Sequence, residues 1–211
     1  SRYGVVLIFD EVSSGFRVAL GSAQEYTGVT PDLSVFAKAI SNGYPMGAVV
    51  GKREYMEPAA RMFISSAYWD DNIGVAASLT TLRELERRDA VAHFNRIGAL
   101  FKERIDAAAA QAGLDAGCKG VAAHPSIRIG VDDPQDAAKV SALFIQENAR
   151  RGVILATGFM FNCSHDIEEV EQTAAVVQES FAVIAEGLAR GTLDQLLDCP
   201  PQEELFRRLV N

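Results

Sequence analysis

One apolar run near the start of the chain constrains its fold more than any other segment. Residues 5–9 read Val-Val-Leu-Ile-Phe, and Asp10 and Glu11 follow directly. An unbroken apolar run of this kind is typical of a strand covered on both faces, as in a parallel sheet flanked by helices. We therefore expect an α/β architecture in which two carboxylates emerge at the end of a buried strand. Because no lead-in precedes this strand, we also expect further residues upstream of Ser1.

A lysine lies in the next apolar segment. Lys38 follows Leu-Ser-Val-Phe-Ala at residues 33–37 and precedes Ala39 and Ile40. A carboxylate such as Asp10 can keep a pyridine nitrogen protonated, and a lysine amine can form an imine with an aldehyde. Pyridoxal phosphate (PLP) uses both groups. The pair therefore predicts a PLP site, with Lys38 as its catalytic residue.

Both residues also have simpler interpretations. Asp10 could cap a turn at the strand end, or it could belong to a Walker B strand, which ends in the same Asp-Glu pair. A Walker B strand needs a phosphate-binding loop, and residues 47–53 (Gly-Ala-Val-Val-Gly-Lys-Arg) have the wrong spacing and no Ser or Thr after the lysine. Lys38 taken alone could be a surface lysine whose stem lies on apolar neighbours.

Apolar periodicity predicts the remaining elements. Two further short strands are expected, at residues 33–37 and 46–50. Asp70 and Asp71 are positioned to cap a helix with apolar residues every three or four positions. A second helix is expected to bury one face, made of Val91, Phe94, Ile97, Phe101 and Ile105.

The region after Gly113 has an α+β pattern. Short strands are expected at residues 126–131, 153–156 and 160–163. Helices are expected at residues 134–151 and 166–188, with one or two short ones in 193–210. The inward face of the long helix is predicted to comprise Val170, Ala174, Val177, Phe181 and Ile184.

Composition narrows the function classes. The formal net charge is −8 and the isoelectric point about 4.9, which argues against a nucleic-acid or anionic-membrane partner. The sequence has no run of about 18 apolar residues. Three scattered cysteines are expected to be reduced thiols in a cytoplasmic protein. The histidines and cysteines lack metal-ligand spacing, so no metal is expected.

Several segments in order resemble the class III (subgroup II) aminotransferases of PLP fold type I, nearest the glutamate-1-semialdehyde aminomutases. The strand with Asp-Glu-Val and then Gly-Phe-Arg, at residues 7–17, is similar to that family's. Three further segments are also similar to the family's. They are residues 28–38, which end in Lys38; the glycine-proline turn at residues 43–48; and residues 163–173, which match its final strand and helix. The resemblance extends from residue 5 to about 185.

The resemblance implies a fold and a domain division. We expect part of the fold type I large domain, a mostly parallel sheet with helices, over residues 1–90. A small α+β C-terminal domain is expected over residues 91–211. The family's N-terminal portion, which carries the loop for the cofactor phosphate, has no counterpart here.

The resemblance also implies roles for individual residues. Lys38 would form the Schiff base, Asp10 would contact the pyridine nitrogen, and Val12 would pack on the ring. Ser13 replaces the family's usual Gln or Met, so a bond from it to the ring oxygen is a hypothesis. Glu11 and Arg17 are expected to form a structural ion pair or to have a role in the turn.

A Ser-Ser-Ala run is expected to complete the cofactor site across a homodimer. Ser66 and Ala67 occupy the place where the family reaches the phosphate of the partner subunit, and Ala67 replaces a threonine. Residues 153–173 contain no arginine of the kind that holds a substrate carboxylate in many family members, which fits the aminomutase-like branch or an amine-using transaminase better than an α-amino-acid enzyme. The resemblance as a whole implies amino-group transfer on a small amine or amino acid, by aminotransferase or aminomutase chemistry. The alternative is a non-catalytic fragment that serves only as a structural or dimerising half.

Overall fold

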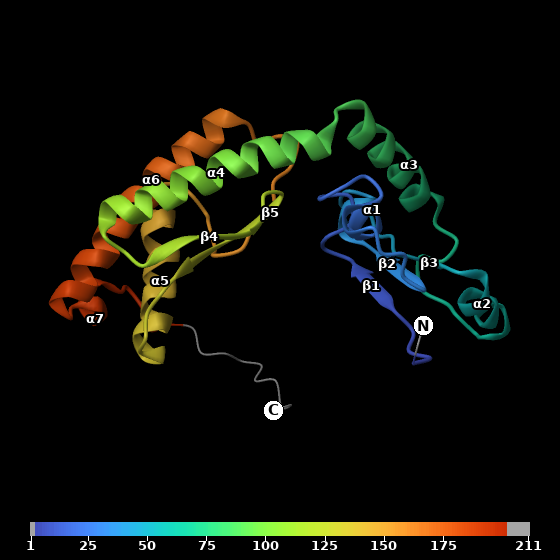
Figure 1. Cartoon of the computed structure of the whole chain (residues 1–211), viewed down its shortest axis with the longest axis horizontal. Coiled ribbons are helices and arrows are strands. Elements are labelled where there is room, and N and C mark those ends of the chain that lie inside the picture. The colour runs from blue at the N-terminus through green and yellow to red at the C-terminus, as the bar shows by residue number, and fades with distance from the viewer. Residues whose placement is uncertain (1–2, 202–211) are drawn as a thin grey trace. The chain divides into compact units, whose positions relative to one another are not determined.

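The computed structural model describes residues 3–201, and its chain divides into two compact units (Figure 1). The first unit ends at Asn95 and the second begins at Arg96. Helix α4 (Ala90–Ala112) contains this division. Each unit is described separately below.

The first unit is built on a small mixed sheet. β1 (Ile8–Glu11) runs parallel to β2 (Leu33–Phe36), and β3 (Ala48–Gly51) pairs antiparallel with β2. The predicted strand at residues 33–37 is confirmed, and the one at 46–50 begins slightly later. In the register of β1 and β2, Asp10 lies opposite Val35. Both parallel strands therefore end at the same edge of the sheet.

The prediction that the first strand is covered on both faces is wrong for the described residues. Ile8 is 54% exposed and Val5 is 67% exposed, whereas Glu11 is buried. The strand begins at Ile8 rather than Val5. An apolar run predicts a strand that is suited to burial, but burial itself depends on neighbouring elements that the run does not encode.

One carboxylate ties the three strands together. Asp32, which is buried, accepts hydrogen bonds from the Leu7 amide at 2.8 Å and from Lys52 Nζ at 2.6 Å. Its own backbone pairs with the same two residues: its amide donates to the Leu7 carbonyl, and its carbonyl accepts from the Lys52 amide. Asp32 thus links the start of β1 and the end of β3 to the start of β2.

Along the chain, short helical segments alternate with and follow these strands. They are α1 (Ser22–Thr27), η1 (Lys38–Ile40), α2 (Arg53–Met56) and η2 (Glu57–Arg61), followed by the longer α3 (Asn72–Arg87). Asp71 caps α3 by accepting a hydrogen bond from the Ile73 amide, as predicted. The buried positions of α3 are Gly74 and Ser78, rather than its apolar side chains.

The second unit packs helices around an antiparallel hairpin. Its elements after α4 are β4 (Ala116–Val121), β5 (His124–Ile129), α5 (Pro134–Arg150), α6 (Ile167–Arg190) and α7 (Leu193–Leu196). The five predicted inward residues of α6 are all buried. Phe144 of α5 lies 5.9 Å from Phe181 of α6, measured between ring centroids.

Residues 153–163 do not form the two predicted strands. The segment contacts the hairpin at an isolated bridge between Ser126 and Gly158, and the Ile127 amide donates to the Thr157 carbonyl at 2.6 Å. The apolar runs were too short to distinguish a strand from an extended loop. In the predicted tail, α7 accounts for the first short helix, and residues 202–211 lie outside the described part of the chain.

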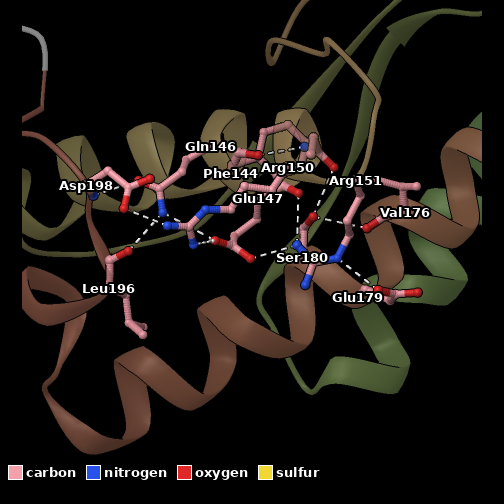
Figure 2. Close-up of polar contacts among 11 residues, drawn as sticks. Phe144, Gln146, Glu147, Arg150, Arg151, Val176, Glu179, Ser180, Leu196 and Asp198 are labelled. Carbon is pink, nitrogen blue, oxygen red and sulfur yellow. Dashed lines mark hydrogen bonds and ion pairs between the residues drawn. The ribbon is translucent and has the colours of Figure 1, made fainter.

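A buried carboxylate of α5 lies at the centre of a group of ion pairs that extends to α6 and to Asp198 (Figure 2). Glu147 accepts hydrogen bonds at 2.6 Å from both Arg150 Nη1 and Arg151 Nη1. Arg150 also binds Asp198, and Arg151 also binds Glu179 of α6. Burial alone would raise the pKa of Glu147, but the hydrogen bonds that it accepts outweigh burial and lower that pKa.

Candidate active site

The turn after β1 is organised around Glu11. The Glu11 side chain accepts hydrogen bonds from Ser14 Oγ at 2.5 Å and from the Ala23 amide at 2.7 Å. Its carbonyl accepts the Gly15 amide at 2.9 Å. The predicted structural role of Glu11 is confirmed, because its buried carboxylate holds the turn against the start of α1.

Phe36, at the end of β2, packs against this turn. The ring of Phe16 stacks on it with a centroid separation of 5.3 Å. Gly15 approaches so closely that an added Cβ would lie 2.8 Å from the Glu11 carbonyl oxygen and 3.0 Å from Phe36 Cδ1. The turn and the end of β2 are therefore held in one arrangement by a contact that only glycine permits.

Lys38 follows Phe36 by two residues and has an unusual backbone. Its φ is +48°, in the left-handed region that residues other than glycine rarely adopt. Its carbonyl accepts hydrogen bonds from the amides of Ser41 and Asn42. Strained backbone of this kind is concentrated at functional sites, where the surrounding structure enforces it. The exposed Lys38 side chain extends to Ser13, whose Oγ accepts a hydrogen bond from Nζ at 2.6 Å.

Asp10 lies in β1, just before this turn. Its Oδ1 accepts the Val12 amide at 3.0 Å, and the residue is exposed at the strand end. Val12 and Ser13 are half-buried beside it. Asp10 and Lys38 thus lie at the carboxyl ends of two adjacent parallel strands, the edge where α/β sheets bind ligands.

Ser66 and Ala67 are not part of this cluster. Both are exposed in the loop between η2 and α3, and the Ser66 carbonyl accepts the Trp69 amide at 3.3 Å. The side chains of Asp10 and Lys38 instead bond to Val12 and Ser13.

Two structural contacts were not predicted from the sequence. One joins Arg17 Nε to the Ser13 carbonyl at 3.0 Å, and the other joins the Asp32 carboxylate to the Leu7 amide and Lys52 Nζ. A signal for Asp32 existed, since a carboxylate directly before a buried strand can cap the free amides of neighbouring strands.

The described part of the chain contains no cluster of three or more His, Cys, Asp or Glu residues that could hold a metal ion. In the same residues, no helix has the length and apolarity of a bilayer-spanning segment.

Comparison with known proteins identifies the family. A family model described as "Aminotransferase class-III" matches residues 1–166. The chain belongs to the class III aminotransferases. This membership confirms the resemblance, and class III aminotransferases are PLP-dependent enzymes.

Two curated class III relatives show the range of activities among similar proteins. The chain is 32% identical over 188 residues to 3-aminobutyryl-CoA aminotransferase of Cloacimonas acidaminovorans, covering 87% of this chain and 45% of the relative. It is 33% identical over 186 residues to glutamate-1-semialdehyde 2,1-aminomutase 2 of Brevibacillus brevis, covering 82% and 43%. The chain thus spans less than half the length of these relatives.

Solved structures show the same partial coverage. FumI of Sphingopyxis sp. MTA144, described in its PLP internal aldimine form, superposes with a TM-score of 0.81 and 26% identity, covering 89% of this chain and 45% of that one. An omega-transaminase from Sphaerobacter thermophilus gives a TM-score of 0.78 and 25% identity, covering 88% and 46%. The predicted fold class, a partial fold type I architecture, is confirmed.

Proposed function

We propose that this class III chain carries the amine-reactive half of a PLP site and takes part in amino-group transfer. The observation that carries the proposal is the placement of Asp10 and Lys38 at the ends of adjacent parallel strands. A carboxylate suits the pyridine nitrogen of PLP, and an exposed primary amine suits its aldehyde. The donor set at this edge therefore fits the cofactor.

Each residue of the cluster has a proposed role. PLP, when bound, supplies an aldehyde for imine formation and a cationic ring that accepts electrons from the substrate carbon. Asp10 would hold the proton on the ring nitrogen by charge attraction. Lys38 would hold the aldehyde and, once freed by a substrate amine, would move a proton to and from the substrate carbon. Val12 would provide an apolar surface for one ring face, and Ser13 lies beside the amine.

The relatives support a proposed substrate class. One is named an aminotransferase and the other an aminomutase, so the chemistry common to both is transfer of an amino group. We propose a small amine or amino acid as the substrate. The absence of arginine from residues 153–173 favours a substrate whose carboxylate, if present, is bound elsewhere.

A homodimer is proposed to complete the site. Ser66 and Ala67 lie in an exposed loop with apolar neighbours, since Phe63 is 98% exposed and Trp69 62%. Exposed aromatic side chains in one segment are typical of a protein interface. In this proposal, Ser66 and backbone amides near Ala67 contact the cofactor phosphate of a second copy. We further propose a cytoplasmic protein, with the cofactor-binding domain in residues 1–90 and the small domain in 91–211.

Adduct mapping tests the function directly. The chain is mixed with PLP, its absorbance is recorded, and the imine is reduced with borohydride before peptide mass spectrometry. We expect a band at about 400–430 nm and a reduced adduct on Lys38. Lys38→Ala removes both, whereas Lys119→Ala, at another exposed lysine, changes neither. Adducts spread evenly over exposed lysines overturn the proposal and favour the non-catalytic structural half.

The role of Asp10 is tested separately. Asp10→Asn keeps the side-chain size and removes its charge. We expect the Lys38 adduct to form still, while the rate of amino-group transfer falls on the order of 100-fold, because the ring nitrogen loses its anionic partner. An unchanged transfer rate contradicts the role given to Asp10.

A further inference from the structure

Both ends of the Lys38 side chain are held by the protein. At the backbone end, the left-handed φ of +48° and the hydrogen bonds to the Lys38 carbonyl fix where the side chain starts. At the amine end, Nζ donates to Ser13 Oγ at 2.6 Å. An exposed lysine normally samples many rotamers, so an anchor at each end is a specific constraint.

Ser13 is itself held in place. Its carbonyl accepts Arg17 Nε at 3.0 Å, and the following residue, Ser14, is bound to the buried Glu11 carboxylate. The turn is pressed against Phe36 through Gly15 and Phe16. The Ser13 hydroxyl is therefore a fixed acceptor rather than a mobile surface group.

From these contacts we infer that Ser13 is a positioning residue that orients the Lys38 amine for attack on the aldehyde of a bound carbonyl compound. This inference rests on the proposed function of Lys38. When neutral Nζ donates one N–H to the Ser13 hydroxyl, its lone pair stays available and has a fixed direction. Orientation of a nucleophile raises its rate of attack without any change in its identity.

The arrangement also explains how a serine can serve at this position. A hydroxyl is short, so it can act on the amine only because the turn brings Ser13 close to the end of β2. Arg17 stabilises this arrangement, because its guanidinium donates a hydrogen bond to the carbonyl of Ser13, whose hydroxyl binds Lys38. Burial lowers the pKa of Arg17 from its ordinary value.

Single-turnover adduct formation tests the inference. The full chain and its variants are mixed with PLP, and the Lys38 adduct is trapped with borohydride at increasing times and quantified by peptide mass spectrometry. For Ser13→Ala we expect the rate of adduct formation on Lys38 to fall about threefold to tenfold, the range for loss of one hydrogen bond. Ser13→Thr keeps the hydroxyl and is expected to remain within about twofold of the parent.

A serine outside the turn provides the control. Ser141→Ala removes an exposed hydroxyl of α5, so the rate is expected to stay within about twofold of the parent. If Ser13→Ala reacts as fast as the parent, or Ser141→Ala is slowed equally, the positioning role is overturned while the Lys38 adduct still forms. Absence of a selective Lys38 adduct in the parent chain instead overturns the proposed function.

Discussion

Lys52 Nζ and the Asp32 carboxylate form a 2.6 Å ion pair that joins the residue after β3 to the residue before β2. The pair is asymmetric, because the Lys52 side chain is 45% exposed and that of Asp32 only 10%. The same carboxylate accepts the Leu7 amide just before β1. The first unit thus depends on one anion for the alignment of its strands.

Removing the charge of Asp32 should destabilise the first unit. The Leu7 hydrogen bond, and then the Lys52 bond, lower the pKa of Asp32 from its ordinary value. A lowered pKa in the folded state stabilises the protein above the unfolded-state pKa, about 3.9, and this contribution is lost as pH falls through the folded-state value. Asp32→Asn should therefore lower the urea midpoint at pH 7, and the difference from the parent should shrink in acid. Asp70→Asn, at an exposed site, is the control. A pH-independent difference contradicts this account.

Gly15→Ala should displace the turn that carries Ser13. The new methyl group would meet both the Glu11 carbonyl and the Phe36 ring, and overpacking of this kind costs about 1–3 kcal/mol. The midpoint temperature of thermal unfolding and the rate of adduct formation on Lys38 should both decrease. Gly47→Ala, where the nearest atom is 3.6 Å away, should leave both unchanged. Equal behaviour of the two variants would show that the close approach of Gly15 to Phe36 is unimportant.

The cysteines should differ sharply in reactivity. Burial, and secondarily the charge of Asp106, raise the pKa of Cys118 to about 11. Cys199 is exposed. Because the thiolate is the reactive form, iodoacetamide at pH 8 should label Cys199 in the folded chain and Cys118 only after denaturation in urea. Peptide mass spectrometry measures the two sites together, and rapid labelling of Cys118 in the folded chain would contradict its burial.

Glu147→Gln should weaken the second unit. The substitution leaves Arg150 and Arg151 without their shared anion, although their other partners, Asp198 and Glu179, remain. We expect a loss of about 1–2 kcal/mol in the free energy of unfolding, since both arginines are partly solvated. Chemical denaturation followed by circular dichroism measures the loss. Glu186→Gln, in an exposed pair with Arg190, should cost much less.

Long periodic segments were the part of the fold that the sequence could predict. The inward face of α6 was identified residue by residue, because a 3.6-residue period leaves one unambiguous stripe. Of the two predicted cap residues, Asp70 and Asp71, the structure confirms Asp71, and it also shows a capping box at Asp166 that was not predicted. Residues 153–163 were mispredicted because short apolar runs carry no such period.

The candidate site was only partly predictable. Asp10 and Lys38 could be selected because their chemistry stands out within apolar segments. The bond between Ser13 and Lys38 depends on the path of the turn and on the packing of Phe36, which arise from tertiary contacts. Sequence patterns report which groups are present, whereas a distance of 2.6 Å between two flexible side chains is a property of the folded chain.

The left-handed backbone conformation at position 38 is unfavourable for a lysine, although the proposed chemistry needs the lysine amine there. Glycine would adopt φ +48° without steric cost, so Lys38→Gly should relieve backbone strain of about 1 kcal/mol. Lys38→Gly would then increase thermal stability and at the same time remove the reactive amine. At this position the best residue for a durable protein and the best residue for a working one are different, so selection for stability alone would drive the lysine out.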